Sequence, residues 1–145
     1  MLGSMHLSAA RKMIAAAESH AVGIAGRAST VVLDQSGDLI AMARIDGAWA
    51  GAFDLALGKA RTSRAFQAPS SAFFPLIQPG QPLFSVNSVG GGQYVMLPGG
   101  LPLLVDGNLV GAVGVSGGST NQDEAIANAA VASFLAWNAK ELHND

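Results

Sequence analysis

Two turn sequences, each set between two apolar runs, constrain the fold of this chain most strongly. Within residues 101–115, Asp106-Gly107 separates two apolar runs. Asp-Gly between such runs is among the strongest short-range signals of a β-hairpin. Residues 29–45 show the same pattern of two apolar runs around a turn, which begins at Asp34 and ends in Gly-Asp. The sequence therefore predicts two antiparallel strand pairs.

The rest of the chain predicts three helices and one long irregular segment. Apolar residues recur at helical spacing over about 8–20, 51–66 and 121–141. Residues 68–98 hold five of the six prolines, and we expect an irregular segment there with a short helical turn at 70–77. Candidate N-cap side chains are Ser8 for the first helix and Ser119, Thr120 or Asn121 for the last, with Gln122, Asp123 or Glu124 three residues on.

The element order is helix, hairpin, helix, loop, hairpin, helix, which predicts an α+β domain. Hairpins require antiparallel pairing, and long helices need a sheet face to cover. We expect one antiparallel sheet of four or five strands with helices on its faces. The length of 145 residues fits a single domain, which we place at 6–145; residues 1–5 look like an addition left by cloning.

Composition excludes several classes of protein. Half of the residues are hydrophobic and only 12% are charged, which excludes disorder and predicts that part of the surface is buried in a homo-oligomer. A net charge of −2 argues against nucleic-acid binding through phosphate neutralisation. The absence of cysteine excludes disulfides, thiolate metal sites and a thiolate-ligated haem. No membrane-span or signal-peptide pattern stands in the sequence, so we expect no membrane partner and a cytoplasmic protein.

The sharpest candidate for a binding loop is Ser116-Gly-Gly-Ser-Thr120, between a predicted strand and a predicted helix. Glycines let a backbone approach a ligand closely, and the free N–H groups of a helix start attract anions. The alternative is a capped turn with tight packing and no ligand.

Three charged residues and one histidine are further candidates. Arg44 at the end of a strand could clamp a carboxylate, or form an ion pair with Asp46 that fixes the turn. Lys59 stands among apolar residues and could serve an acidic ligand or extend to water. His20 is the best histidine for a haem axial ligand or for proton transfer, against the alternative of a surface residue at a helix end. The three histidines show no metal-ligand spacing.

Several strings together resemble a known family. They are 32–47, 58–60, 99–102 with Asp106-Gly107, and 110–118 followed by Gln-Asp-Glu at 122–124. They resemble the GlcG/HbpS family, also called the haem-degrading domain family, which includes the C-terminal domain of PduO. The resemblance implies a profilin-like α/β/α sandwich around a five-stranded antiparallel sheet. It also implies oligomers, from dimers up to octamers.

The resemblance leaves open whether the protein is an enzyme, and three hypotheses remain. The first is a haem- or tetrapyrrole-binding protein that degrades haem, with Arg44, Lys59, Arg61 and Arg64 pairing the propionates and Phe73-Phe74 covering the ring. The second is an enzyme or binding protein for an organic acid of a catabolic pathway, in which Arg44 and the Ser116–Thr120 loop hold the carboxylate and Asp46, Lys59 or His20 moves protons. The third is an accessory oligomer without chemistry. The proposed catalytic residues are Asp46, Lys59 and His20, and the proposed ligand-binding residues are Arg44, Gly99, Gly100, Ser116, Gly117, Gly118, Ser119, Gln122 and Asp123.

Overall fold

A four-stranded antiparallel sheet forms the middle layer of the structure, a computed structural model that describes residues 5–143. The strands are β1 (Ser29–Asp34), β2 (Leu39–Arg44), β3 (Gly100–Val105) and β4 (Asn108–Ser116). Their order is β2-β1-β4-β3, so the two hairpins join side by side through β1 and β4.

Both predicted hairpins are confirmed, and the turn residues explain them. In the first, a side-chain oxygen of Asp34 accepts hydrogen bonds from the backbone N–H groups of Ser36 and Asp38, at 2.9 and 3.0 Å. In the second, Asp106 and Gly107 both have positive φ, 51° and 79°. A tight turn with two positive φ angles matches the right-handed twist of the strands it joins.

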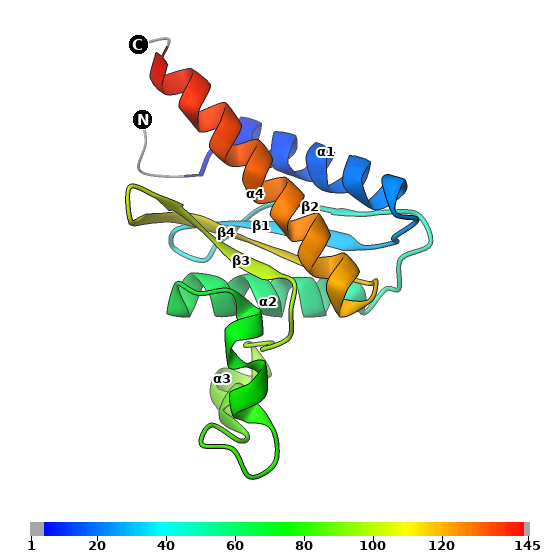
Figure 1. The fold of residues 1–145 in the computed structure, drawn as a ribbon, viewed down its shortest axis with the longest axis vertical. Helices are drawn as coiled ribbons and strands as arrows, with labels where there is room; N and C mark the ends of the chain where they lie inside the picture. The colour runs from blue at the N-terminus through cyan, green and yellow to red at the C-terminus, as the bar shows by residue number, and fades with distance from the viewer. Residues whose placement is uncertain (1–4, 144–145) are drawn as a thin grey trace.

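Helices cover both faces of the sheet, as an α/β/α sandwich requires (Figure 1). One face carries α1 (Leu7–Gly23) and α4 (Thr120–His143), and the other carries α2 (Ala52–Phe66). Alternate residues of β1 serve the two cores: Val32 packs with the α1 and α4 side, whereas Val31 packs with α2. Many of the buried helix residues are alanines, so the helices lie close to the sheet.

The segment between α2 and β3 projects from the sandwich (Figure 1). It consists of the 3-10 helices η1 (Ser70–Ile77) and η2 (Val86–Ser88), followed by the short helix α3 (Val89–Gly92). The expected turn at 70–77 is confirmed. We call residues 67–99 the arm.

The five-stranded sheet implied by the resemblance is wrong for the part of the chain that the structure describes, which has four strands. The arm provides no strand, because its proline-rich sequence forms 3-10 turns that lack a sheet ladder. Its last extended stretch bonds to a helix instead: the N–H of Val95 donates to the carbonyl oxygen of Gly58 in α2, at 3.2 Å.

The N-terminus differs from the expectation in one respect. Helix α1 begins at Leu7, with His6 as N-cap in extended conformation and no side-chain capping bond, so Ser8 lies inside the helix and does not cap it. Residues 1–4, assigned above to a cloning addition, lie outside the described residues. Met5, assigned with them, is buried in the core beneath α1. Within residues 5–143, no helix is both long and apolar enough to cross a membrane.

Candidate functional site

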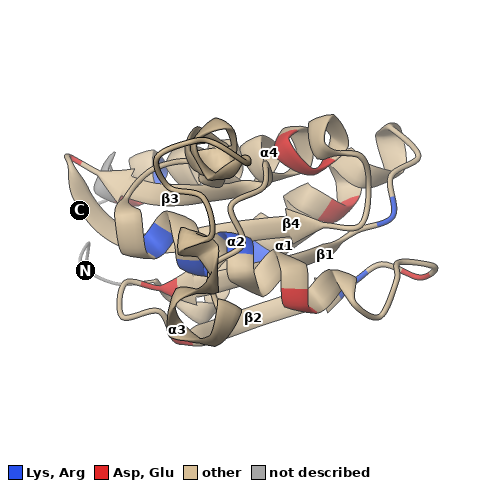
Figure 2. Cartoon of the chain, turned by 90° about the horizontal axis from the view of Figure 1, so that it is seen from below, with Lys and Arg blue, Asp and Glu red and all other residues tan. Residues whose placement is uncertain are grey.

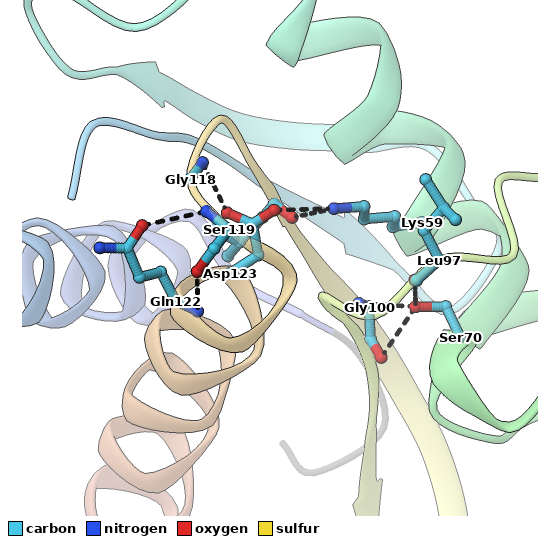
Figure 3. Close-up of polar contacts among 9 residues, drawn as sticks. Lys59, Ser70, Leu97, Gly100, Gly118, Ser119, Gln122 and Asp123 are labelled. Carbon is cyan, nitrogen blue, oxygen red and sulfur yellow. Dashed lines mark hydrogen bonds and ion pairs between the residues drawn. The ribbon is translucent and has the colours of Figure 1, made fainter. Parts of the chain in front are cut away.

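A buried ion pair connects the two helical layers at one end of the sheet. Lys59 of α2 places its Nζ 3.1 Å from Oδ2 of Asp123 in α4, and their side chains are 2% and 3% exposed (Figure 3). The same Nζ donates to the carbonyl oxygen of Val115, at 2.9 Å. Among the side chains that the structure describes, those of residues 5–141, this is the only ion pair. An ion pair this deeply buried is uncommon outside functional sites and structural networks.

Glycines make room for the Lys59 side chain. An ideal Cβ on Gly99 would lie 3.0 Å from both Cδ and Nζ of Lys59, and one on Gly100 would lie 2.8 Å from the Lys59 carbonyl carbon. The hydroxyl of Ser70 holds this turn, since it accepts the N–H of Gly100 at 2.8 Å and donates to the carbonyl of Leu97 (Figure 3). Gly99 and Gly100 therefore allow the backbone before β3 to pack directly against Lys59 of α2.

Burial shifts both groups of the pair toward their neutral forms. Desolvation lowers the pKa of Lys59 from its ordinary 10.5, against the opposing effect of the Asp123 charge. Desolvation raises the pKa of Asp123 from 3.8, against the Lys59 charge and the N–H groups of Gly118 and Gly117. The two shifts bring the pKa values of the pair closer together than those of an exposed lysine and aspartate, which favours proton transfer between the two groups.

Asp123 occupies the position that an external anion was expected to take. Its Oδ1 accepts the N–H of Gly118 at 2.9 Å (Figure 3). Ser119 and Gln122 form a reciprocal capping box, with Ser119 N–H to the Gln122 side chain at 3.0 Å and Gln122 N–H to the Ser119 hydroxyl at 3.2 Å. The predicted cap is confirmed, but the backbone donors of 118 and 119 are already bonded within the chain.

The ion pair lines a small cavity of about 150 Å³. Its walls combine apolar side chains with the glycine loop; the lining residues are Trp49, Ala52, Leu55, Lys59, Leu97, Ser116, Gly117, Gly118, Thr120 and Asp123. The Trp49 side chain is 75% exposed and stands where the cavity meets solvent. The volume is below the usual range for drug-sized ligands, roughly 300–1,000 Å³, so the cavity fits a molecule of only a few heavy atoms.

His20 lines a different and larger hollow, about 520 Å³, on the α1 and α4 side of the sheet. The floor is made of small residues from both helices, including Ala16, Gly23 and Ala129. The His20 side chain is exposed and makes no hydrogen bond within residues 5–143. Its imidazole is therefore available to an external ligand. We call this surface the α1–α4 groove.

A third hollow, of about 210 Å³, lies beside the C-terminal half of α2, where the cartoon shows blue segments (Figure 2). Arg61 and Arg64 line it together with Tyr94, Ser36 and neighbouring residues. Arg64 Nε donates to the carbonyl of Gln35 at 3.0 Å. Neither arginine has a carboxylate within 4.0 Å in the part of the chain that the structure describes. We call this the arginine hollow.

Comparison with known proteins assigns the chain to a family. A family model described as "Haem degrading protein HbpS-like" matches residues 5–132. An uncharacterised 15.0 kDa protein from the dhaT–dhaS intergenic region of Citrobacter freundii is 33% identical over 133 residues, covering 92% of this chain and 94% of that protein. The chain belongs to the HbpS-like family.

Solved structures agree with this assignment. Klebsiella pneumoniae protein ORFY is 31% identical to this HbpS-like chain, with a TM-score of 0.90 and 94% of each chain covered. A crystal structure of a PduOC:haem complex is 29% identical, with a TM-score of 0.85, covering 90% of this chain and 94% of the other. The family relationship predicted from the sequence motifs is confirmed, and these relatives fit a profilin-like fold.

In this HbpS-like chain the structure brings together only part of the predicted site. Lys59, Ser116, Gly117, Gly118 and Asp123 line one cavity, with Gly99 and Gly100 packed against Lys59 and with Ser119 and Gln122 capping the adjoining helix. Arg44 and Asp46 are exposed, line none of the hollows described here and form no ion pair in the described residues. His20 lies in the α1–α4 groove.

Sequence reasoning missed the apolar wall of the Lys59 cavity. Trp49 precedes α2, Leu55 lies in its first turn, and Leu97 lies at the end of the arm. A large aromatic residue just before a helix start was the available signal for Trp49. No local signal indicated Leu97, because its position depends on how the arm returns to β3.

Proposed function

We propose that this protein binds haem in the α1–α4 groove, with His20 as an axial ligand of the iron. The single observation that carries the proposal is the free, exposed imidazole of His20 beside a floor of small residues. Neutral imidazole is a standard ligand of haem iron, and small residues let a flat ring approach closely. The hollow of about 520 Å³ falls within the size range of cofactor sites. The haem complex of the similar PduOC chain supports this choice of ligand.

The residues proposed above for the haem periphery do not belong to this groove. Arg61 and Arg64 line a hollow beside α2, across the sheet from α1 and α4, and Lys59 is committed to Asp123. Phe73 packs on Phe66 at the C-terminal end of α2, with ring centroids 5.3 Å apart. The proposal therefore rests on His20 and the groove, without those cations or aromatic rings.

Haemin titration tests this proposal. We expect the wild-type protein to give a saturable, sharp Soret band, and His20→Ala to weaken binding at least about tenfold because the iron loses a ligand. His6→Ala is the matched control, since His6 is also exposed and lies at the other end of α1. Equal affinity in wild type and His20→Ala would contradict the assignment. So would a loss seen with Tyr94→Phe instead, because a tyrosine oxygen is another type of haem-iron ligand. We further propose that bound haem is degraded, which predicts decay of the Soret band when a reductant and oxygen are added.

The arginine hollow favours a second function, the binding of an organic acid. The guanidinium groups of Arg61 and Arg64 both line this hollow, and neither has a carboxylate partner in the described residues. Guanidinium groups bind carboxylates through paired, charge-assisted hydrogen bonds. We expect succinate to bind, and Arg61→Ala/Arg64→Ala to weaken it about tenfold or more, as judged by calorimetry. Arg11→Ala on α1 is the control, and an unchanged affinity in the double variant would sink the idea.

We also propose that the protein is a homo-oligomer, between a dimer and an octamer. Support comes from the scarcity of charge and from apolar side chains exposed on the arm, such as Phe84 and Val89, each 57% exposed. We expect sedimentation to show a species well above 14.7 kDa, and Phe84→Ser/Val89→Ser to lower its mass. A wild-type protein that sediments as a clean monomer at micromolar concentration would contradict this proposal.

A further inference from the structure

The charges that line the Lys59 cavity select against an anionic ligand. Lys59 and Asp123 are its only charged lining residues, and their formal charges cancel. A carboxylate that approached the Lys59 amine would also approach Asp123, because the two groups are 3.1 Å apart. Bringing a second anion into so dry a site is costly without a second cation. The cavity therefore suits an uncharged ligand.

The walls and the amine together define the kind of uncharged ligand. Trp49, Leu55 and Leu97 offer apolar surface to a short aliphatic chain. Lys59 has three N–H donors when charged, and Val115 and Asp123 accept two of them in the described structure. The charged amine therefore keeps one N–H donor for a ligand in the cavity, and the neutral amine offers its lone pair instead. The matching group on a small neutral molecule is a carbonyl.

We propose that the Lys59 cavity binds a short aliphatic aldehyde or ketone and that Lys59 forms an imine with it. One proton of the Lys59 ammonium passes to Oδ2 of Asp123, the neutral amine attacks the carbonyl carbon, and a second N–H proton moves to the carbonyl oxygen to give a carbinolamine. Asp123 then returns its proton to the carbinolamine hydroxyl, which leaves as water while the carbon–nitrogen double bond forms. The ammonium and the carbonyl thus give a protonated imine beside the Asp123 carboxylate and one water, and no oxidant or reductant is consumed.

The electrostatics of the pair suit both steps. Burial lowers the pKa of Lys59, which increases the share of neutral, nucleophilic amine. Burial raises the pKa of Asp123, which makes the carboxyl a better store for the proton that it must later return. The cavity lies between α2 and the first turn of α4 and shares no lining residue with the α1–α4 groove, so the proposal is independent of haem binding.

Reductive trapping of the wild-type protein tests the imine directly. The folded protein is incubated with propanal and cyanoborohydride, digested, and mapped by mass spectrometry. The chain contains three lysines, and the exposed Lys12 and Lys140 serve as internal controls. We expect propylation of Lys59 at least about tenfold faster than at either control, because the cavity holds the aldehyde against an activated amine. Lys59 that stays unmodified, or that reacts no faster than the controls, overturns the proposal.

Two further aldehydes separate the cavity from general reactivity. Glyoxylate carries a carboxylate, and 2,2-dimethylpropanal is too bulky for about 150 Å³ beside the lysine. We expect both to label Lys59 more slowly than propanal while the exposed lysines follow the intrinsic reactivity of each aldehyde. Faster labelling of Lys59 by glyoxylate than by propanal would overturn the neutral-ligand assignment. Circular dichroism recorded during the reaction, unchanged from that of the untreated protein, verifies that labelling occurs in the folded state.

Discussion

Replacing Asp123 with alanine will lower the free energy of unfolding by about 3–5 kcal/mol, because it leaves the Lys59 ammonium buried without its counter-charge. The substitution also removes the acceptor of the Gly118 N–H, so a second buried group loses its partner. Urea unfolding followed by circular dichroism measures the effect as a shift of the midpoint at constant slope. A loss below about 1 kcal/mol would show that the pair is hydrated and that the buried geometry is wrong.

Lys59→Met/Asp123→Asn is the matched control for that experiment. It removes both charges, keeps an oxygen on residue 123 for Gly118, and replaces the lysine with an apolar side chain of similar length. Because a buried ion pair often contributes no more than an apolar replacement, we expect this double variant to be close to wild type or more stable. A double variant as unstable as Asp123→Ala would mean that packing, not charge, explains the loss.

The two pKa shifts also predict how the difference in free energy of unfolding between wild type and Lys59→Met/Asp123→Asn depends on pH. Folding raises the pKa of Asp123, so the contribution of this carboxyl to the free energy of unfolding is fully present below pH 3.8 and is lost as the pH rises through the folded-state pKa. Folding lowers the pKa of Lys59, so the contribution of this amine to the free energy of unfolding is fully present above pH 10.5 and is lost as the pH falls through the folded-state pKa. The free energy of unfolding of the double variant should therefore exceed that of wild type most near neutral pH. The difference should become smaller at both acidic and alkaline pH.

The hairpins and the last helix cap could be predicted from sequence because each is decided by residues close together in the chain. The positive φ angles of Asp106 and Gly107 follow from residue type and from the apolar runs beside them. The Ser119–Gln122 box is an interaction over three residues. The fifth strand was wrong for the opposite reason: whether residues 94–99 join the sheet depends on the packing of the arm against Gly58 of α2.

The site was predicted as a set of separate residues, and its central contact was not. Both Lys59 and Asp123 were proposed as functional, but 64 positions separate them, and nothing local indicates that they pair. Once Asp123 fills the glycine loop, the loop loses the free N–H groups on which the expected anion site depended. The expectation that Arg44 joins this loop also depended on topology. The loop follows β4, and β1 lies between β4 and the edge strand β2, with Ser29 paired to Ser116 on one side and to Arg44 on the other. The exposed Arg44 side chain does not line the Lys59 cavity.

The closest approach of α2 to the sheet lies at Gly114, and there even one methyl group should be harmful. An ideal Cβ on Gly114 would overlap the carbonyl oxygen of Ala56 and lie 2.8 Å from the backbone nitrogen of Ala60. Both neighbours are helix backbone, so no side-chain rotation can relieve the clash. Gly114→Ala must therefore push α2 from β4, and we expect a loss of about 3 kcal/mol or more.

The control for Gly114→Ala is Gly23→Ala at the end of α1. No atom lies within 4 Å of an ideal Cβ at Gly23, and alanine favours helix, so we expect a gain of up to about 1 kcal/mol. Urea unfolding of the two variants beside wild type measures both effects. Because α2 carries Lys59, Gly114→Ala should also slow labelling of Lys59 by propanal while that of Lys12 stays unchanged. A Gly114→Ala protein with wild-type stability would mean that α2 lies farther from the sheet than these contacts require.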